Sequence, residues 1–385
     1  MDRAGLIALV EDCGCAEAQD GFYFLCDPKW GASERAMVDR LKAQTPTAGD
    51  PRHGWLCIAT GGSSGAIKFA RHDEETVTAA ARGFGAHFDL KRVDAVDVLP
   101  PYHVSGFMAR VRCAETGGVH VPWDWRRLEA GESPELVAGR DWVISLVPTQ
   151  LQRLLALPEA VAWLRQFALI FLGGGPIWRE LSDQAAAEGL RISLSYGMTE
   201  TAAMIAALQP DEFLAGARSA GRVLPHARVS VGDDGVISVG GASLFRGYFP
   251  DGRKAEDFET ADVGRLDEHG HLHVLGRRDT VIITGGEKVL PTEVEAALRA
   301  TGQFADVGVI GLVDPQWGEE VVACYPADER RPDLAAVRAC LAGALAPFKR
   351  PKRYVALAEW PRNAQGKLNR ARLAELVRSA SARSG

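Results

Sequence analysis

The sequence predicts an α/β protein with two domains. The large N-terminal domain is expected to contain mainly parallel sheets flanked by helices, together with a β-rich portion, and the small C-terminal domain is expected to be α+β. Three observations predict this organisation. The chain has 385 residues, which exceeds one ordinary domain. From residue 55, short apolar runs alternate with longer amphipathic stretches, and after residue 215 the pattern changes to that of β-hairpins.

Short apolar runs have the length and composition of buried strands at residues 55–60, 93–99, 141–147, 169–172 and 191–196. After the first run, apolar residues recur at steps of three and four behind Asp73, which predicts a helix with Asp73 as its N-cap. We therefore expect the first two runs to form one βαβ unit of a parallel sheet. Such sheets bind ligands at the carboxyl ends of their strands, so functional residues are expected in the loops that follow the strands.

The β-rich portion begins with a predicted hairpin, because Gly232-Asp233-Asp234-Gly235 separates two β-like runs. A second hairpin is expected within residues 264–275, and Gly276-Arg277-Arg278-Asp279 then interrupts the pattern. We place the domain boundary there, which gives domains at residues 1–278 and 279–385. The second domain has its own helices and strands, expected at residues 292–300, 306–310, 320–325 and 334–345.

The composition narrows the classes of partner. The net charge is −6 and the pI is about 5.9, so the chain offers no broad cationic surface for nucleic acid or anionic lipid. The apolar run at residues 6–10 is too short for a signal peptide or an anchor. Seven scattered cysteines, an odd number, indicate reduced thiols. We therefore expect a cytoplasmic protein with small-molecule partners, no nucleic acid and no membrane insertion.

Two groups of residues invite a metal hypothesis, and we set both aside. Cys13 and Cys15 could ligate a metal, but no second pair of cysteines follows at the spacing of a zinc finger. His269, His271 and His273 alternate and would share one face of a strand, but no fourth ligand is close in the sequence. A solvated strand face accounts for these histidines.

A loop rich in glycine and serine follows the first predicted strand, and we call residues 60–68 the Gly/Ser loop. Glycines let backbone N–H groups approach oxyanions, while hydroxyls add donors and a lysine adds positive charge. Its spacing is not that of a Walker P-loop, and a flexible turn is the alternative. The residues expected to bind phosphate are Thr60, Gly61, Gly62, Ser63, Ser64, Gly65 and Lys68.

A second loop, residues 195–201, follows the last predicted strand of the parallel sheet. Tyr196 could stack on a base next to Gly197, Thr199 could bind a phosphate oxygen, and Glu200 could hold Mg²⁺, which prefers carboxylate and phosphate oxygens. A helix N-terminus with a capping carboxylate is the alternative. A third loop, residues 361–367, ends in Lys367 and could deliver a mobile charge, although most lysines are surface charges.

In this order, the three loops resemble motifs of the adenylate-forming superfamily of acyl-CoA synthetases, luciferases and peptide synthetase adenylation domains. The resemblance covers almost the whole chain from residue 55. It includes a ribose-binding stretch at residues 260–264, an interdomain hinge at residues 276–279 and a loop of the thiol tunnel at residues 284–289. It implies that the small domain is mobile, and that an acid is joined to AMP from ATP before its acyl group passes to a thiol.

The resemblance also implies roles for individual residues. Lys367 would bridge the acyl carboxylate and the α-phosphate, and Glu200 would bind Mg²⁺ beside Thr199. The other implied roles are ribose binding by Asp262 and Arg277, adenine binding by Gly174, Gly175, Pro176 and Tyr196, a pivot at Asp279, and a coenzyme A tunnel at Gly285, Gly286 and Glu287. The implied cofactors are ATP, Mg²⁺ and coenzyme A.

Residues 101–106 and 145–155 look closest to those of o-succinylbenzoate:CoA ligases, the subfamily of the menaquinone and phylloquinone pathways. This acid has two carboxylates, so an extra cationic or hydroxyl contact is expected in its pocket. The candidates for the pocket are Ser105, Gly106, Arg112 and Thr149. His103 could gate the acyl tunnel, and a packed histidine without a special role is the alternative.

The sequence departs from the family pattern at two places. Ile67 stands where many members have proline, and only about sixty residues precede the Gly/Ser loop, so we expect part of the usual first subdomain to be missing. Two other functions are left open: loading of a carrier protein with another acid, and nucleotide binding without turnover. A homodimer is also left open.

Overall fold

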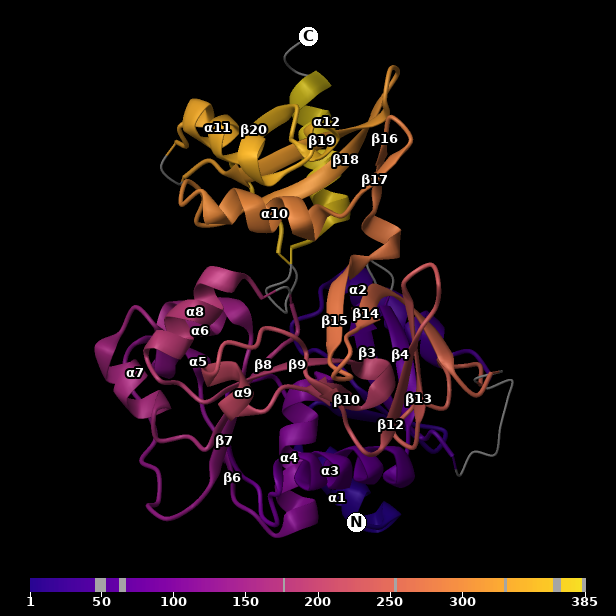
Figure 1. Cartoon of the computed structure of the whole chain (residues 1–385). Helices are drawn as coiled ribbons and strands as arrows, with labels where there is room; N and C mark the ends of the chain where they lie inside the picture. The colour runs from indigo at the N-terminus through magenta and orange to yellow at the C-terminus, as the bar shows by residue number, and fades with distance from the viewer. Residues whose placement is uncertain are drawn as a thin grey trace.

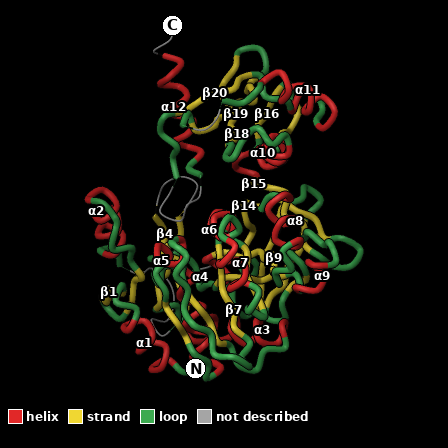
Figure 2. The backbone as a smooth tube through the Cα atoms, turned by 90° about the vertical axis from the view of Figure 1, so that its left-hand side faces the viewer, coloured by secondary structure: helices red, strands yellow, loops and turns green. Residues whose placement is uncertain are grey.

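The structure is a computed structural model of the chain, and it describes residues 1–45, 53–61, 67–175, 177–252, 255–328, 331–362 and 368–382. Figure 1 shows a large part below and a smaller, C-terminal part above it, and Figure 2 shows the same arrangement from the side. The large part holds three sheets and the small part holds one. This confirms the predicted α/β class with a large N-terminal and a small C-terminal region.

The first sheet contains the strand that leads into the Gly/Ser loop. Its strand order is β1-β2-β3-β4, and β3 pairs antiparallel with β4 on the two sides of that loop. The elements of this region are α1 (Arg3–Asp12), β1 (Ala16–Gln19), β2 (Phe22–Leu25), α2 (Ala32–Lys42), β3 (Leu56–Gly61) and β4 (Ile67–His72).

The second sheet is the largest, with the order β11-β10-β9-β8-β7-β5-β6. The strands β6, β5, β7, β8 and β9 are parallel, whereas β10 and β11 are antiparallel. Their bounds are β5 (Asp94–Asp97), β6 (His120–Pro122), β7 (Trp142–Leu146), β8 (Leu169–Leu172), β9 (Ile192–Met198), β10 (Ala203–Ala207) and β11 (Arg222–Val223). The predicted strands at residues 93–99, 141–147, 169–172 and 191–196 are therefore confirmed.

Helices cover both faces of this second sheet because its strands alternate apolar side chains on the two faces. Phe84 and Cys113 pack with Val143 on one face, and Leu151 and Leu181 pack with Ile144 on the other. The helices are α3 (Glu74–Phe88), α4 (Val104–Thr116), α5 (Trp125–Glu129), α6 (Pro148–Leu154), α7 (Pro158–Leu164), α8 (Arg179–Ala187) and α9 (Pro210–Leu214). Asp73 is the N-cap of α3, as predicted.

One topological prediction was wrong. The runs at residues 55–60 and 93–99 do not form a βαβ unit, because the first is β3 of the first sheet and the second is β5 of the second sheet. The reason is that the chain reverses direction after β3 and forms a short strand, β4, which pairs antiparallel with β3 before α3 begins. Its six residues alternate weakly between apolar and polar, so the sequence pattern did not separate them from the loop.

The remaining strands form an antiparallel sheet and the sheet of the small part. The former contains the two predicted hairpins, in β12 (Ala227–Val231), β13 (Val236–Gly241), β14 (Phe258–Leu266) and β15 (Leu272–Arg277). After a short turn, η2 (Arg278–Thr280), come β16 (Ile282–Thr284), β17 (Glu287–Val289), α10 (Pro291–Ala300), β18 (Gly308–Asp314), β19 (Gly318–Pro326), α11 (Leu334–Ala344), β20 (Arg353–Leu357) and α12 (Arg370–Ala382).

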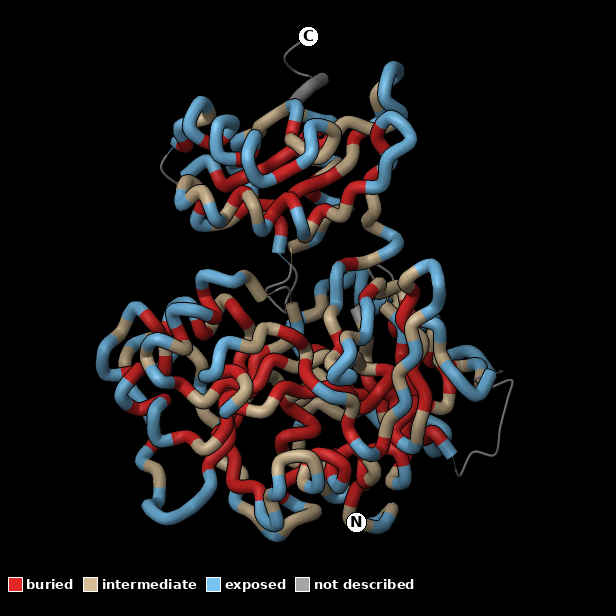
Figure 3. The backbone as a smooth tube through the Cα atoms, in the orientation of Figure 1, coloured by how far each residue is buried: buried red, intermediate tan, exposed pale blue. Residues whose placement is uncertain are grey.

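Each part has a hydrophobic core of its own. Figure 3 shows buried backbone along the strands of both parts and exposed backbone between them. In the small part, Val294 and Leu298 of α10 pack against Val309 and Val321, and Leu373 of α12 packs on the other face of the sheet. Within the described residues, no helix has both the length and the apolar character that crossing a membrane would require. The proposed boundary at residue 278 falls in η2.

Asp73 links the first sheet, the second sheet and the segment after β13. Its side chain is almost fully buried and accepts hydrogen bonds from Thr76 N at 3.0 Å, Gly54 N at 3.1 Å and Arg246 Nε at 2.7 Å. Burial alone would raise the pKa of Asp73, but the bonds from Arg246 and Thr76 outweigh it and the pKa lies below its usual value. The carboxylate therefore stays charged and holds three segments together.

Replacement of Asp73 by alanine should lower the free energy of unfolding by about 3 kcal/mol, because it removes the helix cap and one partner of a largely buried ion pair. Asp73→Asn keeps an acceptor for the N–H of Thr76 and should lose clearly less. Urea denaturation of both variants at pH 7 measures the difference. A loss of under about 1 kcal/mol in the alanine variant would contradict this role.

Candidate active site

The predicted site residues of the large part come together at the carboxyl edge of the second sheet. The loops after β5, β7, β8 and β9 all open at this edge because these strands are parallel. A Cβ on Gly173 would lie 3.0 Å from Ser195 Oγ, and one on Gly174 would lie 3.6 Å from Val147 Cγ1, so neighbouring loops are in contact. The predictions for Thr149, Gly174, Gly175 and Tyr196 therefore converge on one place.

Two glycines of this edge are required by close backbone approach. A Cβ on Gly106, at the start of α4, would lie 2.4 Å from the carbonyl oxygen of Pro100. A Cβ on Gly197 would lie 2.1 Å from the carbonyl oxygen of Ala203. Neither clash can be relieved without moving the backbone, so both glycines serve packing at the edge of the site.

Tyr196, Asp262, Arg277 and Asp279 form one hydrogen-bonded chain. The Tyr196 hydroxyl donates to Asp262 Oδ2 at 2.8 Å, and Arg277 donates to Asp262 Oδ1 at 3.3 Å. Arg277 also binds Asp279 through two bonds of 2.9 and 2.7 Å. The predicted ribose-binding residues and the predicted pivot are thus adjacent. Burial and the charge of Asp262 raise the pKa of Tyr196, so its hydroxyl remains a donor.

Glu200 and Lys68 both contact Tyr248, a residue that the sequence analysis missed. The Tyr248 hydroxyl donates to Glu200 Oε1 at 2.6 Å, and Lys68 Nζ is 5.1 Å from the centre of the Tyr248 ring. Glu200 is 7% exposed. A buried carboxylate with an oxygen that can ligate a hard cation fits Mg²⁺. No spacing in the sequence points to Tyr248, because its two contacts come from distant segments.

His72, a second residue that the sequence analysis missed, holds the loop that carries Thr199 and Glu200 through a hydrogen bond. His72 is fully buried in β4, and its Nε2 lies 2.8 Å from the carbonyl oxygen of Thr199. Its Nδ1 lies 3.1 Å from Thr76 Oγ1. A carbonyl only accepts, so Nε2 carries the proton. Burial lowers the pKa of His72 to about 4, so the ring is neutral at physiological pH.

Arg112 is buried in α4, and no described carboxylate forms a direct ion pair with it, although the charge of Asp97 acts on it. It is 3% exposed, its guanidinium carbon lies 4.4 Å from the centre of the Phe84 ring, and its Nε has no hydrogen-bond partner among the described residues. Both ring nitrogens of nearby His226 also lack a partner there. Burial lowers the pKa of Arg112 to about 10, and burial followed by the charge of Arg112 lowers the pKa of His226 to about 4. At pH 7 a charged guanidinium therefore sits beside a neutral imidazole.

Three of the four predicted acid-pocket residues, Ser105, Gly106 and Arg112, lie on α4, which His103 precedes, whereas Thr149 lies on α6. His103 is the N-cap of α4 and packs against Tyr102, with ring centres 4.6 Å apart. Ser105 and Arg112 are seven residues apart, so they lie on the same face of the helix two turns from each other. Helical side chains lean toward the N-terminus, which directs the Arg112 side chain back toward Ser105.

Some predicted residues are not brought to this edge. Gly285, Gly286 and Glu287 are exposed in the β16–β17 hairpin of the small part, and Gly285 and Gly286 have φ angles of 59° and 82°. In Figure 1 this hairpin is separate from the strands of the large part. Six predicted residues lie outside the described residues: Gly62, Ser63, Ser64, Gly65, Pro176 and Lys367. Thr60 and Gly61 end β3 where the Gly/Ser loop begins.

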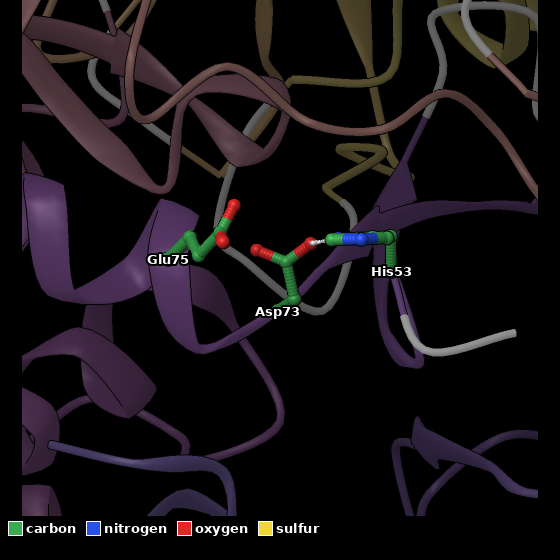
Figure 4. A group of neighbouring side chains, drawn as sticks. All are labelled: His53, Asp73 and Glu75. Atoms are coloured by element: carbon green, nitrogen blue, oxygen red, sulfur yellow. Dashed lines mark ion pairs between the residues drawn. The ribbon is translucent and has the colours of Figure 1, made fainter. Parts of the chain in front are cut away.

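One group of potential metal ligands occurs away from this site. Figure 4 shows Asp73 between His53 and Glu75. Arg246 binds Asp73 at 2.7 Å and Glu75 at 2.5 Å, so a guanidinium already engages both carboxylates and balances one of their two charges. The carboxylates thus have a cationic partner within the protein, and we assign no metal to this group. The alternating histidines, His269 and His271 before β15 and His273 in it, lie next to carboxylates, such as His273 next to Asp267 at 2.9 Å.

The fold is that of an α/β protein with a large and a small part, and the candidate site lies at the carboxyl edge of the second sheet of the large part. The chain belongs to the AMP-binding enzyme family: that family model matches residues 12–249, and the model of the C-terminal domain of AMP-binding enzymes matches residues 293–367.

Two curated relatives of the chain carry the same name. The chain is 34% identical over 283 residues to 2-succinylbenzoate–CoA ligase of Listeria monocytogenes, which covers 72% of this chain and 60% of the relative. It is 32% identical over 340 residues to the same-named ligase of a Geobacillus species, which covers 83% of this chain and 68% of the relative. The chain thus spans about three fifths of the length of the Listeria relative.

A solved structure has the same fold. It is o-succinylbenzoate CoA synthetase from Bacillus subtilis in complex with an acyl-adenylate intermediate, with a TM-score of 0.74 and 25% identity. The match covers 97% of this chain and 81% of the other.

The buried His72 predicts an acid-sensitive stability. Its pKa is about 4 when folded and about 6.5 when unfolded, so between these values the unfolded chain binds a proton that the folded chain does not. Its contribution to the free energy of unfolding should fall by up to about 1.4 kcal/mol per pH unit as the pH drops through this window. His72→Gln should show a shallower fall in urea denaturation at pH 7, 6 and 5.

The control for this test is His269→Gln, because His269 is 69% exposed at the tip of the β14–β15 hairpin. That variant should keep the slope of the unmodified protein. Equal slopes in His72→Gln and the unmodified protein would contradict the neutral, buried state of His72.

Proposed function

We propose that the chain is an AMP-forming acid–thiol ligase that joins 2-succinylbenzoate to coenzyme A with ATP, a step of menaquinone or phylloquinone biosynthesis. Family membership and the shared name of the relatives support the reaction. The observation that carries the choice of acid is the buried guanidinium of Arg112, whose Nε has no hydrogen-bond partner among the described residues.

In the first half-reaction, a carboxylate oxygen of the acid attacks the α-phosphorus of ATP, and pyrophosphate leaves. Both reactants are anions, so positive charge must be placed between them. By resemblance, Lys68 would supply part of this charge, and Lys367 would bridge the carboxylate and the α-phosphate. Bound Mg²⁺ supplies further positive charge on the phosphates, and Glu200 would hold it. Asp262 and Arg277 would bind the ribose hydroxyls.

In the second half-reaction, the sulfur of coenzyme A attacks the carbonyl carbon of the acyl-adenylate, and AMP leaves. The residues assigned to the thiol tunnel, Gly285 to Glu287, are on the small part and separate from the nucleotide residues. A rotation of the small part about Asp279 would exchange Lys367 for this hairpin. We also propose that the boundary between the two domains lies at residue 278.

Physical chemistry favours an acid with a second carboxylate. A buried ion without a partner costs several kcal/mol, and an anionic ligand that pairs with it recovers that loss. With a pKa of about 10, Arg112 is still charged at pH 7. One carboxylate of 2-succinylbenzoate would react at the α-phosphate while the other pairs with Arg112 deeper along α4. The seven cysteines are free, which is consistent with the cytoplasm as the place of this reaction.

The proposal predicts a preference for the diacid that depends on Arg112. The unmodified protein should release pyrophosphate with 2-succinylbenzoate and ATP with a kcat/KM about 10–100-fold above that for monoacids lacking either carboxylate, because a hydrogen-bonded charge pair is worth about 1.5–3 kcal/mol. Arg112→Met should remove most of this preference and leave the rate with the better monoacid similar. Mass analysis with coenzyme A should then show the thioester.

Arg110→Met is the matched control, because Arg110 is on the same helix and pairs with Asp12 at 2.5 Å. It should keep the preference for the diacid. Pyrophosphate release from none of these acids would overturn the proposed reaction, and a preference that survives in Arg112→Met would overturn the role of Arg112. A thioester that forms only on a carrier protein would overturn the assignment of coenzyme A.

A further inference from the structure

Tyr248 joins two residues that different motifs assign to the phosphates and the metal. Its hydroxyl donates to Glu200 Oε1 at 2.6 Å, and its ring centre lies 5.1 Å from Lys68 Nζ. Glu200 is on the loop after β9, whereas Lys68 is on β4. Tyr248 itself lies between β13 and β14 and belongs to none of the predicted motifs.

The backbone around Tyr248 is fixed to both neighbours. Tyr248 forms an antiparallel bridge with Ala70 of β4, and Phe249 N donates to Phe69 O at 2.9 Å. On the other side, Phe245 N donates to the carbonyl oxygen of Glu200 at 2.8 Å. The short segment of residues 245–249 therefore spans from the strand of Lys68 to the turn of Glu200.

The Tyr248 ring is also held on the side away from Lys68. Its centre lies 4.9 Å from that of Phe245 and 6.4 Å from that of Phe258, in edge-to-face arrangements. Both ring contacts and the strand bridge restrict the side chain. The direction of the hydroxyl toward Glu200 is therefore set by the scaffold.

The contact between Tyr248 and Glu200 has the length of a hydrogen bond from a hydroxyl to a carboxylate, with the phenol donating to Oε1 at 2.6 Å. A phenol offers one donor, so Tyr248 engages Oε1 and does not occupy Oε2. The negative face of the ring attracts the ammonium group of Lys68.

We propose that Tyr248 is a positioning residue of the magnesium and phosphate site, an inference that rests on the proposed function. Its hydroxyl fixes the Glu200 carboxylate so that Oε2 faces the metal of MgATP, and its ring holds the Lys68 ammonium beside the phosphates. Tyr248 thus positions two groups of opposite charge: the Glu200 carboxylate, which would bind the metal, and the Lys68 ammonium, which would bind the phosphates of the same nucleotide.

Two substitutions separate the two roles. Tyr248→Phe removes the hydroxyl and keeps the ring, its aromatic neighbours and the seat of Lys68. Tyr248→Leu removes both. Tyr354→Phe is a matched control, because the Tyr354 hydroxyl is buried on β20 of the small part and has no hydrogen-bond partner among the described residues.

The test is calorimetric titration of ATP into each protein at several Mg²⁺ concentrations and with EDTA, which measures binding without turnover. Tyr248→Phe should need about tenfold more Mg²⁺ for half-maximal enhancement of ATP binding, the effect of losing a hydrogen bond to a charged group. Its ATP affinity in EDTA should be unchanged. Tyr248→Leu should also bind ATP more weakly in EDTA, and Tyr354→Phe should match the unmodified protein.

A double-mutant cycle with Glu200→Gln gives a second measurement. If Tyr248 acts through Glu200, Tyr248→Phe should add little to the Mg²⁺ requirement of Glu200→Gln. Fully additive effects, or an unchanged Mg²⁺ requirement in Tyr248→Phe, would overturn the proposal for Tyr248. Failure of the unmodified protein to bind ATP at any Mg²⁺ concentration would instead overturn the proposed function.

Discussion

The candidate site depends on the pairing of one short segment, residues 245–249, with two elements that are distant in sequence. It bonds to β4 through Phe69 and Arg71 and to the turn after β9 through the carbonyl of Glu200. The first sheet and the turn after β9 of the second sheet are thereby linked at the point where Lys68 and Glu200 both contact Tyr248. Without this link, the lysine and the carboxylate would belong to separately packed sheets.

Some polar groups of the site have hydrogen-bond partners within the protein, and others do not. Glu200, Asp262 and the Thr199 carbonyl each have a hydrogen-bond partner within the protein, so the nucleotide edge is built before any ligand arrives. The turn after Glu200 is strained, with φ angles of 50° at Ala202 and 81° at Ala203. Arg112 and His226 are the opposite case, because Arg112 Nε and both ring nitrogens of His226 are buried without a hydrogen-bond partner among the described residues. The proposed preference for an acid with a second carboxylate rests on this unpaired guanidinium nitrogen.

The sequence allowed the placement of residues whose position follows from local patterns. Parallel strands with loops at their carboxyl ends put Tyr196 and Glu200 at one edge, and the hairpin pattern put Asp262 opposite Arg277. The contacts of Tyr248 and His72 could not be predicted, because they join residues 48 and 127 positions apart through the packing of separate sheets. The strand β4 was missed for a related reason: six residues pair only because β3 lies beside them.

Burial was the other property that the sequence did not reveal. Arg112 was a candidate for the acid pocket only through the expected charge of the acid, and nothing in its neighbours along the chain shows that its guanidinium is enclosed against Phe84. His226 stood outside every motif, although Gly83 leaves the space that its ring fills: a Cβ there would lie 1.9 Å from Nδ1. Such relations between α3, α4 and the loop before β12 exist only in the folded chain.

The proposed pairing of the acid with Arg112 is tested most directly by a crystal structure of the protein with ATP, Mg²⁺ and 2-succinylbenzoate, or with the acyl-adenylate that they form. The account predicts that the carboxylate remote from the phosphate lies within hydrogen-bond distance of the Arg112 guanidinium. An acid bound with that carboxylate in solvent, and Arg112 still without an anionic partner, would contradict it.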